Sequence, residues 1–250
     1  MPSLFPNFSQ RSAESEIMDG TDFSEEEIRG AYDDLQRVNR FLGGTRALLR
    51  HALPLIERLA TRPVSVLDLG SGSADIPRAL VQAARHKRIP IHIVALDANP
   101  HAIRAATEQL EQFPEIDVVQ ADALRWPFPD GSFDLVIASE FLHHLSDEDA
   151  VWLLRHARRL ARVALLINDL RRHPLAYYSF WMLSRMFTRN RLIRHDGLVS
   201  ILRGFTADDL ARIRQHPELA DLAVHFHFPY RIVFIGMNQQ TGCTQRARQP

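Results

Sequence analysis

The sequence of 250 residues has one cysteine, no excess of either charge and no long apolar run. The single Cys243 excludes a disulfide framework within the chain, so we expect a cytosolic protein. The 30 Lys and Arg residues balance the 30 Asp and Glu residues, which leaves no overall basic field to hold nucleic acid. The N-terminus lacks a basic region followed by an apolar run, and residues 175–187 are apolar but interrupted. We therefore predict neither a signal peptide nor stable membrane insertion.

What the sequence does contain, from residue 64 onward, is a regular alternation of short β-branched runs and helix-periodic segments. The runs VSVLDL, IHIVAL and VALLIN are apolar without alternation, which is typical of strands buried on both faces. Such an order indicates a parallel sheet with helices on both faces. We predict an α/β, Rossmann-like, doubly wound fold with a mostly parallel seven-stranded sheet whose last strand is antiparallel. The predicted strands are 64–69, 91–96, 118–121, 133–138, 163–167, 224–228 and 231–235, and the predicted helices of the sheet region are 76–84, 100–112 and 147–160.

The segments around this alternation differ in character. Residues 1–22 are polar and are expected to be mobile or lightly docked. Ser24 and Glu27 form a capping-box pattern that begins an N-terminal helical cap over residues 23–60. The main domain then covers 61–237, with a helical lid inserted at about 171–205 after the fifth strand. Residues 238–250 are expected to be a disordered tail.

A glycine loop follows the first predicted strand. Gly70 and Gly72 permit a tight turn and close approach of a ligand. The dinucleotide fingerprint requires a third glycine where Asp75 stands, and an anionic side chain there would repel a pyrophosphate. The P-loop pattern is also absent from the sequence. S-adenosylmethionine fits better, because its sulfonium is positive and its amino group needs acceptors, which Asp68 and Asp75 supply.

Two further acids end the next two strands. Asp97 ends the second strand, where a carboxylate can accept hydrogen bonds from ribose hydroxyls. Asp122 ends the third strand, where it can receive an adenine amino group. The alternative is that each acid only caps the helix that follows it. Together with the glycine loop, the three strand-end acids indicate one ligand-binding rim at the carboxyl edge of the sheet.

These motifs resemble those of the class I S-adenosylmethionine-dependent methyltransferases. The resemblance rests on VLDLGSGSADIP, on ALDANPHAI, on VVQADALRWPFPDGSFDLVIASEFLHHL and on the closing strand pair, and it covers about residues 64–236. The third segment is similar to the group that contains quinone-biosynthesis and small-molecule methyltransferases. Ala74 departs from the commonest loop of the family, which has a third glycine at that position.

The resemblance implies S-adenosyl-L-methionine as the cofactor and a role for each matching position. Gly70, Ser71 and Gly72 would line the methionine part, and Ser139 would lie near the sulfonium and the amino group. Asp97 would hold the ribose. Ala98 and Asn99 would lie beside the adenosine, and Asp122 and Ala123 would contact the adenine. We also expect Asn39, Arg40 and the two glycines of the unusual turn RVNRFLGG to close over the cofactor's carboxylate, with a plain helix connection as the alternative.

Residues just beyond the fourth and fifth strands would face the transferred methyl group. His144 is the first candidate for a general base, because an imidazole titrates near neutral pH. His143 is a second candidate, and Asp169 could orient a histidine or bind a substrate hydroxyl. Alternatively, these residues only shape the pocket. We predict no metal.

The inserted segment concentrates aromatic and methionine side chains, which suits a flat apolar substrate. The candidate substrate-binding residues are Tyr177, Tyr178, Trp181, Arg194 and His195, with packing inside a helical core as the alternative.

We therefore expect methyl transfer to a small aromatic acceptor, as O-methylation of a phenol, a quinol or a polyketide-like metabolite. Carbon methylation of a quinone precursor is the alternative. The Asn/Asp-Pro-Pro-Tyr/Phe signature of base methylation is absent where Ser139-Glu-Phe-Leu stands, which disfavours nucleic-acid methylation. A protein methyltransferase or a non-catalytic binding module is a weaker alternative. We expect a small-molecule acceptor, no nucleic acid, and a monomer or homodimer.

Overall fold

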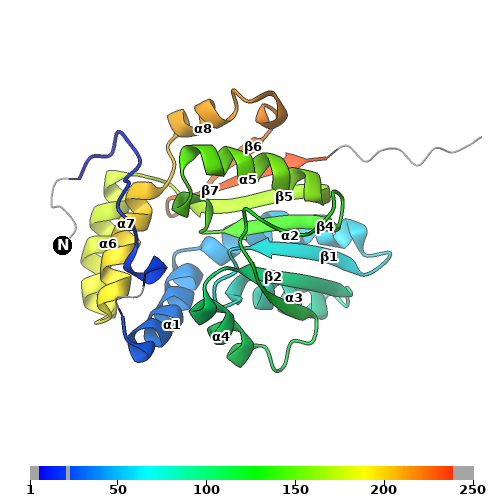
Figure 1. The fold of residues 1–250 in the computed structure, drawn as a ribbon, viewed down its shortest axis with the longest axis horizontal. Coiled ribbons are helices and arrows are strands. Elements are labelled where there is room, and N and C mark those ends of the chain that lie inside the picture. The colour runs from blue at the N-terminus through cyan, green and yellow to red at the C-terminus, as the bar shows by residue number, and fades with distance from the viewer. Residues whose placement is uncertain (1–5, 21–22, 239–250) are drawn as a thin grey trace, which may run out of the picture.

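A twisted seven-stranded sheet forms the centre of the part of the chain that the structure describes, residues 6–20 and 23–238 (Figure 1). In this computed structural model the strand order is β3-β2-β1-β4-β5-β7-β6. The pairs from β3 to β5 are parallel, whereas β7 runs antiparallel to both β5 and β6. The predicted fold class is confirmed. The strands are β1 (Val64–Leu69), β2 (Ile91–Asp97), β3 (Ile116–Gln120), β4 (Phe133–Ser139), β5 (Ala161–Leu170), β6 (Ala223–His227) and β7 (Arg231–Met237).

The helices begin where the local sequence offers caps. Ser24 and Glu27 form the predicted capping box at the start of α1, and Thr206 and Asp209 form another at α8. Asn99 caps α4, whose first residue is Pro100. The helices are α1 (Glu25–Phe41), α2 (Gly44–Leu59), α3 (Asp75–His86), α4 (Pro100–Gln109), α5 (Asp147–Leu160), α6 (Pro174–Phe187), α7 (Arg191–Arg203) and α8 (Ala207–Ile213), with short 3-10 turns η1 (Ile17–Asp19), η2 (Leu142–His144) and η3 (Pro217–Leu219).

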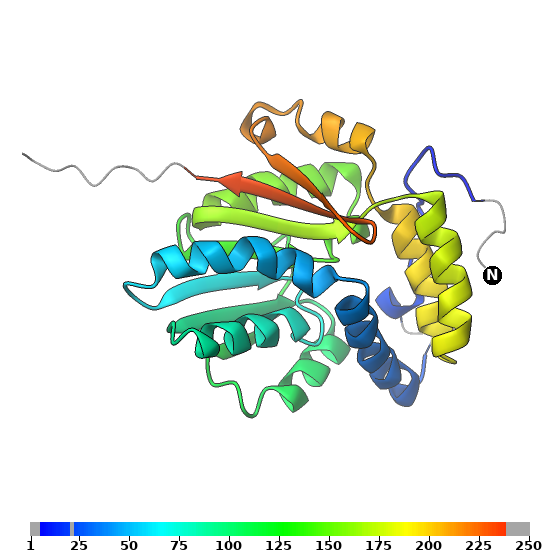
Figure 2. The same cartoon turned by 180° about the vertical axis from the view of Figure 1, so that it is seen from behind.

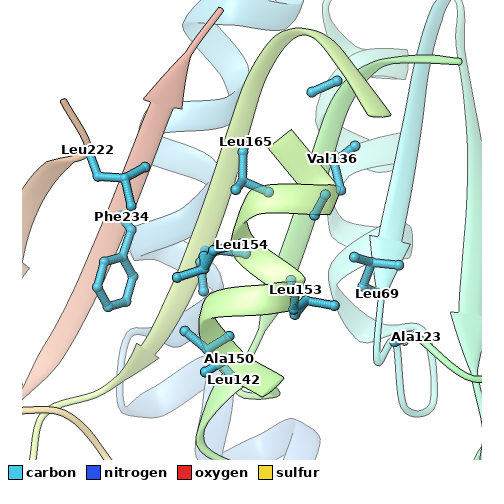
Figure 3. Packing of buried hydrophobic residues seen from close by; sticks show 14 of the residues in the cluster. Leu69, Ala123, Val136, Leu142, Ala150, Leu153, Leu154, Leu165, Leu222 and Phe234 are labelled. Carbon is cyan, nitrogen blue, oxygen red and sulfur yellow. The ribbon is translucent and has the colours of Figure 1, made fainter. Parts of the chain in front are cut away.

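Helices cover both faces of the sheet, as the apolar strands require. On one face α5 packs against β4, β5 and β7, where Leu153 and Leu154 meet Leu165 and Phe234 (Figure 3). On the other face α2, α3 and α4 cover the strands (Figure 2), and Leu48, Ile56 and Leu80 are fully buried there. Each buried side chain of this size stabilises the fold by about 1.5–3 kcal/mol relative to exposure. The two cores fix the strand ends that carry the candidate site.

A third core lies beyond the carboxyl edge of the sheet. There α1, α6 and α7 pack together, with Tyr32, Tyr177 and Leu198 buried among them (Figures 1 and 2). Residues 6–20 lie against this bundle and against η2. Arg11 donates hydrogen bonds to the carbonyls of His143, Leu145 and Arg203. The contacts dock this segment more firmly than we expected, while its mobility stays a prediction.

A buried acid ties the opposite, amino edge of the sheet together. Asp134 of β4 is fully buried and accepts from Arg62 Nη1 at 2.9 Å and from Arg162 Nε at 3.0 Å. The backbone N–H of Ser65 in β1 donates to the same carboxylate at 2.9 Å. Burial alone would raise the pKa of Asp134, but these hydrogen bonds and charges hold it well below its usual range. Asp134 therefore links β1 and β4 far from the glycine loop.

Two further predictions concern the C-terminal tail and membrane insertion. The expected tail and Cys243 lie outside the described residues, apart from Asn238, whose side chain bonds to the carbonyls of Arg158 and Ala161. Within residues 6–20 and 23–238, none of the helices has the length and apolar character needed to cross a bilayer.

Candidate functional site

A cavity of about 720 Å³ opens at the carboxyl edge of the sheet. One wall consists of the β1–α3 loop and the ends of β2 and β4, and the facing wall comes from α1, α6, α7 and the N-terminal segment. The sheet side is rich in carboxylates, whereas the facing side combines apolar side chains with three carboxylates, those of Glu16, Asp19 and Asp196. The predicted rim therefore forms half of an enclosed site. The lining includes Gly70, Ser71, Gly72, Asp75, Asp97, Ala98, Asn99, Asp122, Ala123, Ser139 and His144.

The loop after β1 turns through three left-handed residues. Gly70 has φ +67° and Gly72 has φ +55°. A Cβ on Gly70 would lie 2.3 Å from the Phe141 ring, whereas a Cβ on Gly72 would meet no heavy atom within 4 Å. Gly72 therefore gives the open backbone that we expected beside a ligand, while Gly70 makes room for Phe141. Ala74 has φ +58°, which explains why a glycine suits this position in related loops.

Three carboxylates crowd together beneath this loop. Burial, reinforced by Asp75 and Asp97, raises the pKa of Asp68 well above its usual range. Burial and the charge of Glu140 raise the pKa of Asp75 to about 6, and burial also raises the pKa of Asp97. Asp68 Oδ1 and the hydroxyl of Ser71 are buried without a hydrogen-bond partner among the described residues. The arrangement favours a cationic, hydrogen-bonding ligand at this point.

The ends of β2 and β3 hold their acids in different ways. Asp97 Oδ2 accepts from the N–H of Gly72 at 2.8 Å, and its Oδ1 accepts from the N–H of Asn99 at 2.8 Å. Both oxygens retain free lone pairs for a ligand hydroxyl. Asp122 is exposed, and its Oδ1 accepts from the N–H of Leu124 at 2.8 Å. Asp97 is therefore held rigidly at the cavity, whereas Asp122 lies at its rim.

Beyond β4 the chain builds a buried ion pair that sequence reasoning missed. Glu140, at φ +54°, pairs with Arg231, whose Nη1 lies 2.7 Å from Glu140 Oε1, and Arg231 is almost fully buried. With its amide nitrogen turned toward Glu140, Asn39 donates to both carboxylate oxygens at 2.8 Å. Of the two side chains that we expected over the cofactor's carboxylate, Asn39 lines the cavity, whereas Arg40 is exposed and does not appear in the described lining.

The two histidines after β4 occupy different environments. His143 is buried, and its Nδ1 lies 2.8 Å from Asp169 Oδ1. Burial disfavours a charged ring, but Asp169 and Glu16 outweigh it and raise the pKa of His143 to about 10. The His144 ring is partly exposed, lines the cavity and places Nδ1 3.1 Å from Asp19 Oδ2. His144 therefore faces the cavity, while His143 and Asp169 form a buried pair behind it.

Glu16 is a second residue that the sequence analysis missed. It is buried, lines the cavity and accepts from Ser200 Oγ at 2.6 Å. Burial alone would raise its pKa, but His144 and a contact with His143 lower the pKa of Glu16 to about 2. In the sequence, Glu16 is a single acid within a polar segment, and no motif marks it as a site residue.

The lid wall is built mainly from residues other than the five predicted for substrate binding. Phe180 of α6 and Gly197 of α7 meet there, since a Cβ on Gly197 would lie 2.3 Å from the Phe180 ring. The space that this glycine leaves lets the ring form part of the wall. The lid residues of the lining are Leu170, Phe180, Ile193, Asp196, Gly197, Ser200 and Ile201.

The five predicted substrate residues do not appear in the described lining. Tyr177 is buried and contacts Phe8 edge-on, at 5.7 Å between ring centroids, and Tyr178 is exposed on the outer side. Trp181 lies under the guanidinium of Arg185, 4.1 Å from the ring centroid. This geometry therefore does not support direct substrate contact by these aromatic residues.

Arg194 and His195, the two polar residues predicted to bind substrate, contact other protein groups instead. Arg194 Nε donates to the carbonyl of Thr188 at 2.8 Å. His195 Nδ1 lies 2.7 Å from Asp196 Oδ1, and its Nε2 lies 3.2 Å from Glu14 Oε1. Both side chains stabilise the lid rather than extend into the cavity.

Comparison with known proteins agrees with this geometry. A family described as "Methyltransferase domain" matches residues 66–163. A demethylmenaquinone methyltransferase of Thermotoga maritima is 29% identical over 62% of this chain and 66% of its own length. An O-methyltransferase of Aspergillus nomiae is 30% identical over 56% of this chain and 62% of its own length. The crystal structure of a magnesium protoporphyrin IX methyltransferase from Synechocystis shares the fold, with a TM-score of 0.57 and 14% identity over 86% of this chain and 99% of that one.

Over residues 66–163 the chain is therefore similar to methyltransferases, in agreement with the resemblance of its motifs. It spans just under two thirds of the length of these two curated relatives.

The described residues fit S-adenosyl-L-methionine, the cofactor that the resemblance implies. Asp68 Oδ1 and the Ser71 hydroxyl are buried without a hydrogen-bond partner among the described residues, and burial raises the pKa values of Asp68, Asp75 and Asp97. An ammonium group would donate hydrogen bonds to such oxygens, and its charge together with that of a sulfonium would stabilise the ionised carboxylates. The open side of Gly72 leaves the backbone accessible at the same place.

Proposed function

We propose that this protein is an S-adenosylmethionine-dependent methyltransferase that transfers a methyl group to a hydroxyl oxygen of a small aromatic acceptor, such as a phenol, a quinol or a polyketide-like metabolite. One observation carries the proposal: a single cavity joins the acid-rich rim to the apolar surface of Phe180, Ile193 and Ile201 on the lid side, with His144 facing that cavity. The rim suits a polar, cationic cofactor and the lid suits a flat apolar molecule. When bound, S-adenosylmethionine supplies an electrophilic methyl group on a positively charged sulfur.

In this proposal the sheet side binds the cofactor. Asp97, fixed by two backbone N–H groups, accepts hydrogen bonds from the ribose hydroxyls. Asp68 and Asp75 accept from the amino group, which favours their ionised forms. Ser139, which accepts from Asn168 Nδ2 at 2.8 Å, lies near the methionine part. Asp122 and Ala123 at the rim contact the adenine.

The lid side would hold the acceptor. Phe180, Ile193 and Ile201 supply apolar surface, and α6 and α7 exclude water from that part of the cavity. His144 meets the acceptor hydroxyl and takes its proton, with Asp19 holding the ring through Nδ1. His143 and Asp169 support the turn η2 that presents His144.

Carbon methylation of a quinone precursor is the second candidate. It is supported by the relative named demethylmenaquinone methyltransferase, and an activated ring carbon needs less of a dedicated base. The same cavity would bind such a ring against Phe180. The two candidates differ in the product, because O-methylation consumes a hydroxyl and C-methylation retains it.

The direct test is incubation with S-adenosylmethionine carrying a deuterated methyl group and a panel of catechols, naphthoquinols and hydroxyanthraquinones. We expect a labelled product whose fragmentation places the methyl on oxygen. A label on ring carbon would favour the second candidate, and label transfer only to protein or nucleic acid would contradict both. Binding of the cofactor is tested separately, by comparing the melting temperature of the protein in the presence of S-adenosylhomocysteine and in the presence of a nicotinamide dinucleotide.

A matched pair of variants tests the acceptor half. Phe180→Leu alters a side chain in the cavity wall, whereas Trp181→Leu alters its neighbour, which is absent from the described lining and packs against the third core. We expect the first to raise the KM for the acceptor about fivefold and the second to leave it within about twofold, since fivefold corresponds to about 1 kcal/mol of lost apolar contact. Equal effects of both would contradict this placement of the acceptor. A cytosolic location stays a prediction.

A further inference from the structure

The side chains of Glu16, His143 and His144 meet beside the cavity. We propose that they bind a divalent transition-metal ion, such as Zn²⁺ or Fe²⁺, with open coordination positions that face the cavity. One ligand atom of each residue lies within 4.8 Å of the others. We predicted no metal from the sequence, because Glu16 stands in a distant polar segment and shows no ligand spacing with the two histidines.

The separations within this cluster suit a shared ion better than direct hydrogen bonds. Glu16 Oε1 lies 3.4 Å from His143 Nε2, and Glu16 Oε2 lies 3.8 Å from His144 Nε2. A nitrogen–oxygen hydrogen bond is about 2.9 Å long, whereas two ligands each about 2.1 Å from a tetrahedral ion lie about 3.4 Å apart. Ser200 Oγ donates to Glu16 Oε1 at 2.6 Å and fixes the carboxylate between the rings.

Both histidines are oriented as metal ligands are. His143 Nδ1 contacts Asp169 Oδ1 at 2.8 Å, and His144 Nδ1 contacts Asp19 Oδ2 at 3.1 Å. A carboxylate on one ring nitrogen fixes the tautomer and leaves the other nitrogen free to coordinate a metal. In both rings that other nitrogen, Nε2, is the one nearest to Glu16.

A buried atom without a partner supports the site independently. The His143 ring is 2% exposed, and its Nε2 has no hydrogen-bond partner among the described residues. Glu16 and His144 both line the cavity, so an ion between them has a side open to a small molecule. Two imidazoles and one carboxylate suit Zn²⁺ or Fe²⁺, whereas Mg²⁺ and Ca²⁺ prefer oxygen ligands alone.

The role of the ion, though not the site, rests on the proposed function. An acceptor hydroxyl on the open side would coordinate the ion, which lowers the pKa of that hydroxyl as it does for bound water. The His144 imidazole would then hold the ion, and the hydroxyl proton would pass to solvent water at the open side of the cavity. Metal binding needs no acceptor, so its failure is distinguishable from failure of the methyl-transfer proposal.

The test is a Co²⁺ titration of chelator-treated, untagged protein, followed by visible absorption and by displacement with Zn²⁺. We expect one Co²⁺ per chain with a ligand-field band, complete displacement by Zn²⁺, and no competition from Mg²⁺. Glu16→Gln should weaken Co²⁺ binding more than about 100-fold. Asp19→Asn, which changes only an orienting carboxylate, should weaken it about 10-fold.

A variant in a second histidine cluster provides the control for the metal-binding test. A second histidine cluster lies at α2 and β6, where His51 Nε2 is 2.8 Å from His227 Nε2 and its ring is 4.6 Å from that of His225. His51→Gln should leave the ligand-field band and the Co²⁺ affinity unchanged. Absence of binding in the wild type, or binding lost in His51→Gln but retained in a folded Glu16→Gln, would overturn the proposal. Circular dichroism of each variant verifies that it is folded.

Discussion

Asp134 at the amino edge of the sheet and Asp68 at its carboxyl edge are both buried, but only Asp134 has counter-charges. Asp134 is bound by Arg62, Arg162 and the N–H of Ser65. Asp68 has an unpartnered oxygen and two further acids nearby. The pKa of Asp134 is lowered and the pKa of Asp68 is raised. At the amino edge a buried aspartate therefore stabilises the fold through its counter-charges. At the carboxyl edge a buried aspartate has no such partners, and a bound ligand would supply them.

The largest effect should come from Asp134→Ala. We expect the free energy of unfolding in urea to fall by about 3 kcal/mol, since removal of one partner of a buried pair costs about 3–5 kcal/mol and the two arginines can reach water. Affinity of the folded variant for S-adenosylhomocysteine should stay unchanged.

The matched control is Glu25→Ala, which breaks an exposed pair with Arg104. That change should cost less than about 0.5 kcal/mol. An equal loss in both variants would show that Asp134 does not anchor the amino edge.

At the carboxyl edge, Asp97→Ala should act on affinity instead. Loss of two hydrogen bonds to the ribose should weaken binding of S-adenosylhomocysteine about 100-fold, measured by calorimetry. Asp117→Asn, which changes an exposed acid of β3 paired with His92, should leave the affinity within about twofold. A normal affinity in Asp97→Ala would remove Asp97 from the proposed cofactor site.

The two edges should also respond to pH with opposite signs. Asp134 has a lowered pKa when folded, so its advantage over Asp134→Asn is present above about pH 4 and is lost as the pH falls. Asp75 has a pKa of about 6 when folded, so the ligand-free wild type should lose stability relative to Asp75→Asn as the pH rises from about 4 to about 6. We expect the second difference to reach about 2 kcal/mol in urea unfolding at a series of pH values. If the stability differences for Asp134→Asn and for Asp75→Asn changed with pH in the same direction, the contrast between the two edges would be contradicted.

A small effect on stability should come from Asp68→Asn. Removing a poorly partnered acid from beside Asp75 and Asp97 should change the free energy of unfolding by no more than about 1 kcal/mol, in favour of the variant. Affinity for S-adenosylhomocysteine should nevertheless fall about 10-fold. A large loss of stability would show that Asp68 is a structural acid like Asp134.

The sequence predicted the sheet and the rim well because both depend on local patterns. Uniformly apolar runs identify strands buried on both faces, and acids that follow such strands must meet at one edge of a parallel sheet. The structure places Gly72, Asp75 and Asp97 together in the cavity lining accordingly.

The lid and the histidine environment could not be predicted in the same way. The sequence shows that α6 is aromatic but not which of its faces meets the cavity, so Tyr177 and Trp181 were chosen although Phe180 lines the wall. Gly197 was the available signal, since a glycine within a helix often makes room for a large neighbour. Glu16 and Arg231 reach the site through contacts across the whole chain, which no local pattern encodes.

The ion pair between Glu140 and Arg231 can form during translation only after β7 has been synthesised. Glu140 enters the cavity wall from the loop after β4, but its counter-charge is the first residue of β7, the final strand that the structure describes. A nascent chain that has emerged only as far as β5 would carry the glycine loop, the strand-end acids and an unneutralised Glu140. Cofactor capture during translation should therefore wait for the closing hairpin, which makes ligand binding a reporter of the folded β6–β7 hairpin.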